Sequence, residues 1–279
     1  MLLAAVLALS ASALWGVGDF LGGLSSRRIA VFTVLVGSQV IGLLGAVVWL
    51  VVSGDAWPGY GDALAACGAG AAGIIGLAAL YRGMSIGAMG IVAPISAASP
   101  VVPLAFDVAQ GRSPSALQWL GIVVVLAGIV VLSRHPGESA AGGAAAGVSL
   151  ALVAALAFGF FYVGVDVAAD SSVPWTVTLA RGAASVLALA AALAARTAVV
   201  PPRNLLPAIA GVGLFDTAAN VCLVAASTHG AVGVVAVLAA IYPVVTVTLA
   251  FAVLGERLDR ARRGAGLVAL AGAALVAAG

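Results

Sequence analysis

The sequence predicts an all-α membrane protein in which ten transmembrane helices form two inverted five-helix repeats. The first observation is composition: of 279 residues, 63% are hydrophobic and 8% are charged, whereas soluble domains carry about 25% charged residues. Polar residues are therefore too scarce to cover a globule in water. The second observation is that the chain matches itself at an offset of 143 residues, for example from Gly70 to Gly213. The net charge of +2, without a long basic run, predicts no nucleic-acid partner.

Ten apolar runs lie between polar residues, glycines and prolines, and most of them approach the 20 or so residues that a helix needs to cross a bilayer. The runs are 2–24, 30–52, 62–81, 86–109, 115–133, 144–167, 173–195, 204–226, 231–254 and 264–279. What remains of the chain makes short loops and leaves no room for a soluble domain. The lipid bilayer is thus the first predicted partner.

The internal match predicts two halves, residues 1–139 and 144–279, that form one integral-membrane unit. At the offset of 143, Gly87 falls on Gly230, Gly121 falls on Gly264, and Pro100 falls on Pro243. Each half holds five runs, and an odd number makes the second copy enter the membrane in the opposite direction. Inverted repeats of this kind are typical of secondary transporters, whose substrate site lies near the midplane between the halves.

Several short motifs resemble one family, the ten-span EamA-type branch of the drug/metabolite transporter superfamily. They are Trp15-Gly16, Gly230-Ala231-Val232-Gly233, Tyr242-Pro243, Gly255-Glu256-Arg257-Leu258 before Gly264, and Arg181 in the seventh run. The first half departs from the pattern, with Gln110-Gly111-Arg112 in place of a Gly-Glu pair and Ser38-Gln39 in place of an arginine. The resemblance implies export or exchange of small solutes such as amino acids, drugs or nucleotide sugars, without naming one, and no enzymatic activity.

Two charges lie deep inside apolar runs, where an ionisable group is costly and hence a functional candidate. Asp216 is midway along the eighth run, with Asn220 on the same helix face four residues later. The pair is either a cavity-facing site for an amine or a proton, or a polar contact between helices. Arg181 either binds a substrate carboxylate or pairs with an acid such as Asp216 or Asp166. An acid and an arginine in one cavity would suit a zwitterion.

Aromatic and acidic residues share a face on the first helix of each predicted half. Trp15 precedes Asp19 by four residues, and Tyr162 precedes Asp166 by four. Both acids also lie toward helix ends, where a solvated position at the membrane surface is equally consistent with the pattern. Three further residues are candidates for hydrogen bonds to a substrate, with an aromatic belt at the membrane surface as the alternative for the tyrosines; they are Gln39, Tyr81 and Tyr242.

Prolines inside the fourth and ninth runs predict kinked helices, because a proline within a helix frees a carbonyl group. These residues are Pro94, Pro100, Pro103 and Pro243, of which Pro100 and Pro243 are repeat mates. Matched kinks in both halves indicate a site at the midplane.

No metal site and no cofactor is predicted, since His135 and His229 are single loop histidines; proton coupling through Asp216 is a separate hypothesis. Gly83-Met84-Ser85-Ile86-Gly87 spells the nucleophile elbow of a hydrolase, but it follows no strand. We therefore expect a secondary transporter, in the exporting direction, of a small polar or amphipathic metabolite such as an amino acid or related amine. The alternatives are efflux of lipophilic cations and, more remotely, an intramembrane enzyme acting on lipid.

The predicted location is the cytoplasmic (inner) membrane of a bacterium, because all twelve basic residues are arginine in a chain rich in Ala, Gly and Val. Ten of these arginines fall in the loops after odd-numbered runs. The positive-inside rule then places both termini outside, whereas the family resemblance implies that both are inside. The sequence leaves the oligomeric state open, and a monomer is plausible.

Overall fold

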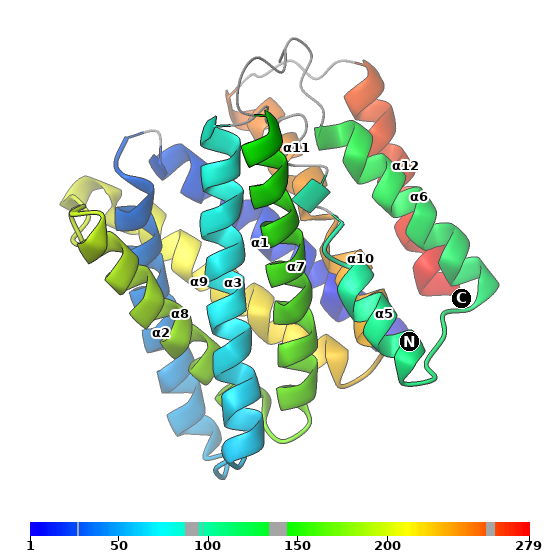
Figure 1. Ribbon diagram of the computed structural model, residues 1–279, viewed down its shortest axis with the longest axis horizontal. Helices are drawn as coiled ribbons and strands as arrows, with labels where there is room; N and C mark the ends of the chain where they lie inside the picture. The colour runs from blue at the N-terminus through cyan, green and yellow to red at the C-terminus, as the bar shows by residue number, and fades with distance from the viewer. Residues whose placement is uncertain (27, 87–94, 97, 134–143, 255–259) are drawn as a thin grey trace.

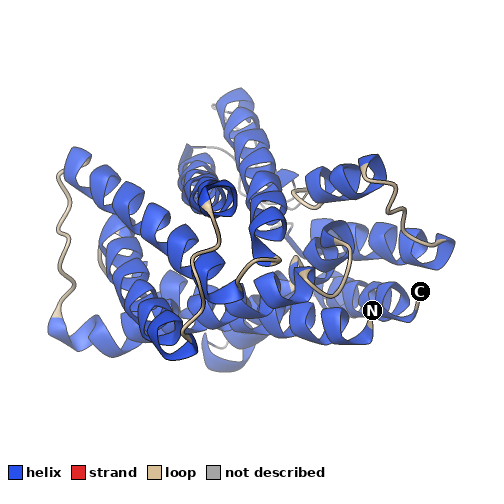
Figure 2. Cartoon of the chain, turned by 90° about the horizontal axis from the view of Figure 1, so that it is seen from below, coloured by secondary structure: helices blue, strands red, loops and turns tan. Residues whose placement is uncertain are grey.

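Helices are the natural structure for these apolar runs, because a bilayer offers no water to bond the N–H and C=O groups of the backbone. The computed structural model describes residues 1–26, 28–86, 95–96, 98–133, 144–254 and 260–279. Those residues form helices joined by short connections, and no strand occurs among them (Figures 1 and 2).

The helices follow the predicted runs closely. They are α1 (Leu2–Ser26), α2 (Val31–Ser53), α3 (Tyr60–Ile86), α5 (Val101–Ala109), α6 (Ala116–Ser133), α7 (Ala144–Ala169), α8 (Val173–Ala194), the 3₁₀ turn η1 (Arg203–Leu205), α9 (Leu206–Ser227), α10 (Val232–Ala239), α11 (Tyr242–Leu254) and α12 (Arg260–Ala278). Among the described residues, six segments are long and apolar enough to cross a membrane, and they lie in α1, α2, α3, α7, α8 and η1–α9. The chain is thus a helical membrane protein, and the count of ten spans stays a prediction.

The predicted ninth run is divided into two helices, and the kink predicted there at Pro243 stays a prediction. Helix α10 ends at Ala239, two turn residues follow, and α11 begins at Tyr242. Pro243 is the second residue of α11. A proline is tolerated there because it has no backbone N–H and the N–H groups of a first turn have no partner within the helix, whereas farther along the helix its ring would clash with the preceding turn.

The described prolines of the fourth run also lie where a helix begins. Pro100 precedes the first residue of α5 and Pro103 lies in its first turn, where the backbone N–H of Leu104 already bonds the Pro100 carbonyl at 3.0 Å. Both prolines therefore stand at the start of a helix instead of inside one. Pro94 lies outside the described residues.

Helices from the two predicted halves pack against one another in matched pairs. Helix α3 lies beside α7 and α1 lies beside α9, while α2 packs on α8 and α6 packs on α12 (Figure 1). At the offset of 143, α1 corresponds to α7 and α3 to α9, so exchanging the halves converts the α3–α7 pair into the α9–α1 pair. The α2–α8 and α6–α12 pairs are each converted into themselves. Two related repeats would give this pattern.

Two glycines show the same correspondence at atomic detail. A Cβ atom on Gly16 of α1 would lie 2.5 Å from Cβ of Val245, and a Cβ atom on Gly159 of α7 would lie 2.5 Å from Cβ of Val102. Both pairs of residues are related by the offset of 143. Each glycine lets its helix approach a neighbour more closely than any side chain would permit.

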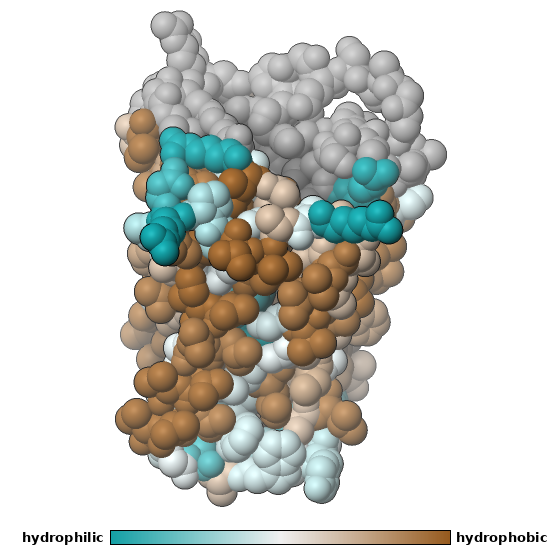
Figure 3. Space-filling view, turned by 90° about the vertical axis from the view of Figure 1, so that its left-hand side faces the viewer, coloured by the Kyte–Doolittle hydropathy of each residue, from teal (hydrophilic) through white to brown (hydrophobic). Residues whose placement is uncertain are grey.

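The outer surface carries the large apolar residues that a lipid-facing protein needs. On α2 these include Leu44, Val48 and Val52, and on α8 they include Val186 and Leu193. Figure 3 shows a broad hydrophobic band over this side of the molecule, bordered above by hydrophilic residues. Such a patch is far larger than soluble monomers expose.

Candidate functional site

A cavity of about 450 Å³ lies between the two halves, lined by α1, α2, α3, α7, α8 and α9 together with the start of α11. Its volume falls within the range of about 300–1,000 Å³ that is typical of small-molecule pockets. The lining runs from the middle of these helices to Ser26 and Val31, at the end of the molecule where α1 stops and α2 begins.

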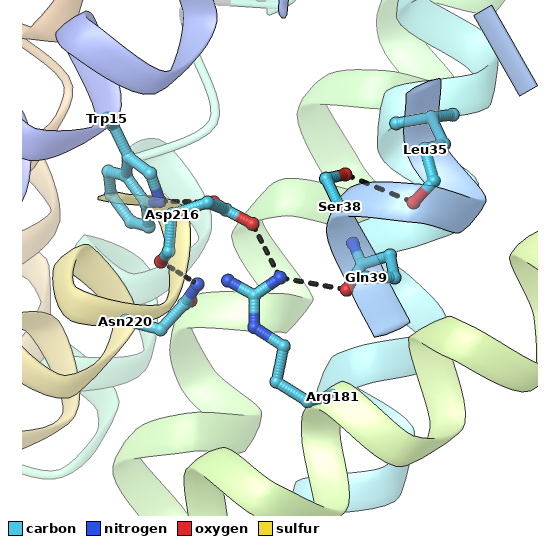
Figure 4. Close-up of polar contacts among 7 residues, drawn as sticks. All are labelled: Trp15, Leu35, Ser38, Gln39, Arg181, Asp216 and Asn220. Atoms are coloured by element: carbon cyan, nitrogen blue, oxygen red, sulfur yellow. Dashed lines mark hydrogen bonds and ion pairs between the residues drawn. The ribbon is translucent and has the colours of Figure 1, made fainter. Parts of the chain in front are cut away.

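An ion pair between Arg181 of α8 and Asp216 of α9 lies at the centre of the cavity wall (Figure 4). Nη1 of Arg181 is 2.5 Å from Oδ2 of Asp216, and the same nitrogen donates to Oε1 of Gln39 at 2.8 Å. The indole N–H of Trp15 donates to Oδ1 of Asp216 at 2.9 Å. The ion pair and these two hydrogen bonds thereby connect four helices, which are α1, α2, α8 and α9. The prediction had left open whether Arg181 pairs with Asp216 or Asp166, and the structure selects Asp216.

The two partners of this ion pair differ in their access to the cavity. The Arg181 side chain is 5% exposed, whereas the Asp216 side chain is 31% exposed. Nη2 of Arg181 is buried without a hydrogen-bond partner among the described residues. Gly42 of α2 lies beside this side chain and makes room for Thr217 of α9, since a Cβ atom there would collide with Oγ1 of Thr217. The guanidinium group therefore retains one unused terminal nitrogen, which is what binding of a further acceptor requires.

Asn220 lines the cavity one helical turn beyond Asp216. Its Nδ2 atom donates to the backbone oxygen of Asp216 at 2.7 Å, so the amide does not bond the carboxylate itself. In Figure 4 the Asn220 side chain points toward the guanidinium group of Arg181. The shared face of Asp216 and Asn220 thus faces the cavity.

Aromatic rings form the wall next to the ion pair. The Trp15 ring centroid lies 6.4–6.5 Å from those of Phe161, Tyr162 and Tyr242, and its plane is steeply inclined to each. These separations suit edge-to-face contacts between aromatic rings. The cavity consequently has a charged side and an aromatic side.

Asp19 of α1 also lines the cavity, one helical turn after Trp15. Its side chain is exposed to the cavity, and it makes no hydrogen bond or ion pair with any described residue. Asp19 is thus a carboxylate without a counter-charge among the residues that the structure describes.

Asp166 is not among the residues that line this cavity, and its prediction as a substrate-binding group stays a prediction. Its Oδ2 atom lies 3.6 Å from Nη2 of Arg112, and the same nitrogen lies 3.1 Å from Oδ1 of Asp107. Asp107 is fully buried, and its other oxygen accepts from the backbone N–H of Gly233 at 2.6 Å, where α10 begins. Because successive helix residues point in different directions, Val165 faces the cavity and Asp166 faces this cluster.

The remaining predicted residues have mixed placements. Tyr242 and Pro243 line the cavity where α11 begins, whereas Pro100 and Pro103 are not among its lining residues. Tyr81 belongs to α3, but its side chain lies outside the described part of the structure, as does that of Ser85. Gln39 lines the cavity and bonds Arg181.

Sequence reasoning missed Phe161, Ser99 and the apolar α3 residues Ile74 and Leu77, all of which line the cavity. Ser99 could have been found from the sequence, because the offset of 143 makes it the repeat mate of Tyr242, which is a predicted site residue. Phe161 could not have been found in this way, since its mate is Gly18, which is not a predicted site residue.

Comparison with known proteins identifies the family. The model of the EamA-like transporter family matches the chain twice, over residues 2–134 and 145–278. No curated protein matches the chain. One solved crystal structure of a protein has a similar fold. The match covers 98% of this chain and 95% of that chain, with 19% sequence identity and a TM-score of 0.80. That similarity concerns the fold alone. The two family matches cover almost the whole sequence, and the chain therefore belongs to the EamA-like transporter family, within the drug/metabolite transporter superfamily.

Proposed function

We propose that this protein is a secondary transporter that exports a small amphipathic metabolite bearing an amine, such as an amino acid or a related compound, by alternating access. The observation that carries the proposal is the Arg181–Asp216 ion pair in the wall of a central cavity. An ion pair placed at this depth is expensive, so that a role in binding is the economical explanation.

The chemistry of the wall favours a ligand with a charged head and an apolar body. An amine on the ligand would find the carboxylate of Asp19 or the partly exposed carboxylate of Asp216, whereas a carboxylate would have to reach the unused Nη2 of Arg181, which is buried. The apolar body would lie against Phe158 and Phe161 of α7. Guanidinium–carboxylate bonds are among the stronger hydrogen bonds in proteins, so this arrangement can orient as well as hold the ligand.

Alternating access is supported by the matched packing of the two predicted halves and by the different chemistry at the two ends of the cavity. The lining reaches Ser26 and Val31 at one end. Toward the other end, Arg112 lies between Asp107 and Asp166 and so links the α5–α6 connection to α7. We propose that this charge cluster closes the second end while the first end admits the substrate.

Transport itself is tested in proteoliposomes with the purified protein, by counterflow of radiolabelled amino acids and amines. Asp216→Asn should reduce uptake to near the level of empty liposomes, because it removes the partner that positions Arg181. Asp170→Asn is a matched control, since that acid is exposed and is not among the lining residues of the cavity. Normal counterflow by Asp216→Asn would overturn the assigned role of the ion pair.

Proton coupling through Asp216 is a separate proposal. A substrate carboxylate that binds Arg181 would leave Asp216 without its cation, and the acid could then take up a proton. Uptake against imposed pH gradients tests this step. An Asp216→Asn variant that transports with intact coupling would exclude it while leaving the transporter proposal in place.

The direction of transport and the membrane orientation are proposed together for the cytoplasmic membrane of a bacterium. The exposed arginines among the described residues include Arg28, which follows α1, Arg82, which lies in the last part of α3, and Arg203, which precedes α9. The positive-inside rule places that end of the protein in the cytoplasm, and the cavity reaches the same end. An exporter would load its substrate from there.

The second candidate function is efflux of lipophilic cations, which the four-ring cluster around Trp15 favours. Aromatic faces attract cations, and Trp provides the strongest attraction. Expression should then protect cells from toxic lipophilic cations, and amino acids should not compete with such cations for uptake into proteoliposomes.

A further inference from the structure

Among the residues that the structure describes, the charged groups that line the cavity do not balance one another. They are Asp19, Arg181 and Asp216, two carboxylates and one guanidinium group. With all three ionised, this described lining carries a formal charge of −1. A charge that is withdrawn from bulk water is stable only when it is paired or neutralised, so the cavity as it stands calls for one positive charge.

The excess negative charge belongs to Asp19. Both carboxylate oxygens of Asp216 are already engaged, Oδ1 by the indole N–H of Trp15 and Oδ2 by Arg181. Asp19 is exposed to the cavity and bonds none of the described residues. Asp216 is thus the carboxylate that the protein satisfies, and Asp19 is the carboxylate that it leaves to a ligand.

We propose that Asp19 is the subsite for the positively charged group of the substrate, and that the cavity selects amphipathic monocations, such as primary amines, over zwitterions and anions. This inference rests on the proposed transport function and narrows its substrate class to amines without a carboxylate, so that amino acids are disfavoured. Trp15 lies one turn before Asp19 on the same helix, so that its ring can face the cation that the carboxylate pairs.

The α3 wall of the cavity explains why the ligand needs an apolar body. The offset of 143 makes Gly73 the mate of Asp216 and Leu77 the mate of Asn220. Both α3 residues line the cavity, as do Ile74 and Phe158. The positions on α3 that correspond to the polar residues of α9 are therefore apolar, and a polar group of the ligand that lies against them would be left unpaired.

The test uses three probes that share a phenyl ring and a short chain but differ in charge: phenethylamine, phenylalanine and 3-phenylpropionate. Their binding to the purified protein in detergent, near neutral pH, is measured by calorimetry. Phenethylamine should bind about tenfold or more tightly than phenylalanine, and phenylpropionate should bind least. Phenylalanine binding as tightly as phenethylamine, or no binding of phenethylamine, would overturn the proposal.

Substitution of the carboxylate then locates the subsite. Asp19→Asn keeps the size of the side chain and removes no described contact, so that the fold should be preserved. It should weaken phenethylamine binding about 10- to 100-fold, the effect of losing a hydrogen bond to a charged group. Asp19→Glu should restore most of the affinity. Asp170→Asn, the same chemical change outside the cavity, is the control. Wild-type affinity in Asp19→Asn would refute the assignment.

Transport measurements separate this inference from the function on which it rests. If phenylalanine is both the tighter ligand and the transported probe, the transporter proposal stands and the charge selectivity is wrong. If phenethylamine binds through Asp19 but shows no counterflow in proteoliposomes, the subsite stands and the transport of this class is wrong.

Discussion

The Arg181–Asp216 ion pair makes a quantitative prediction for stability. Removing one member of a buried ion pair costs about 3–5 kcal/mol, because the other charge is left buried without compensation. Arg181 is 5% exposed and would be left in that condition by Asp216→Asn, but Asp216 is 31% exposed and water in the cavity weakens its share. We therefore expect Asp216→Asn to lower the free energy of unfolding by about 2–3 kcal/mol on this scale. Arg181→Gln should cost a similar amount because it also removes the bond to Gln39.

A double-mutant cycle isolates the interaction between the two charges. The double variant Arg181→Gln with Asp216→Asn has no unpaired charge at this position, so that its loss should be about 2 kcal/mol smaller than the sum of the single losses. The free energy of unfolding is measured in mixed micelles for all four proteins. Arg181→Gln combined with Asp170→Asn is the control, because Asp170 lies in the turn before α8 and should be additive. A coupling below about 0.5 kcal/mol would refute the reasoning, since independent sites already vary by that much.

Three further predictions concern packing, the charge cluster and orientation. Gly16→Ala and Gly159→Ala should each destabilise the protein by about 1–3 kcal/mol through overpacking, whereas Gly45→Ala, which meets open space, should be neutral or stabilising; equal midpoints of unfolding for all three would contradict the close approach. Asp107→Ala should cost about 1–3 kcal/mol because it leaves the buried N–H of Gly233 without an acceptor. Arg112→Gln leaves the fully buried Asp107 carboxylate without its cation, but Arg112 is 44% exposed and water screens the pair, so this variant should also cost about 1–3 kcal/mol; unchanged stability would show that the ion pair contributes nothing. A reporter fused to the C-terminus should be active outside the cytoplasm if the arginine distribution sets the orientation, and activity inside would favour the family expectation.

Much of the fold was predictable because one physical requirement dominates the sequence. A bilayer demands long apolar helices, and the predicted runs 2–24, 30–52 and 173–195 differ from α1, α2 and α8 by only one or two residues at either end. The start of α8 is marked in the sequence by a serine that caps the helix and by a proline two residues later. Oγ of Ser172 accepts a hydrogen bond from the backbone N–H of Trp175 at 3.2 Å, and Pro174 lies in the first turn. The break before Tyr242 was missed because hydropathy does not change there, and the choice between a kink and a break depends on neighbouring helices.

The sequence indicated which residues line the candidate site better than it indicated which of them contact one another. The cost of burying a charge singled out Asp216 and Arg181, and the cavity contains both. Periodicity could not show that Trp15 and Gln39 complete the pair, because those residues come from other helices. The same limit applies to Asp166. Its position near a helix end was visible, but its partner Arg112 stands in a loop whose location depends on how α5 and α6 pack.

The two predicted halves combine a repeated packing scheme with charges that are not repeated. The contacts of Gly16 with Val245 and of Gly159 with Val102 are equivalent, but the repeat mate of Arg181 is Ser38 and that of Asp19 is Tyr162. Under the proposed alternating access, exchanging the conformations of two halves that pack alike changes the packing energy little, so the two ends can open at similar free energies. A ligand needs about 5.5 kcal/mol of differential affinity to move an equilibrium from 1:99 to 99:1, and far less if the two states are nearly balanced. The unrepeated charges can then act on that balance, because a cation at Asp19 would stabilise whichever of the two arrangements binds it more tightly.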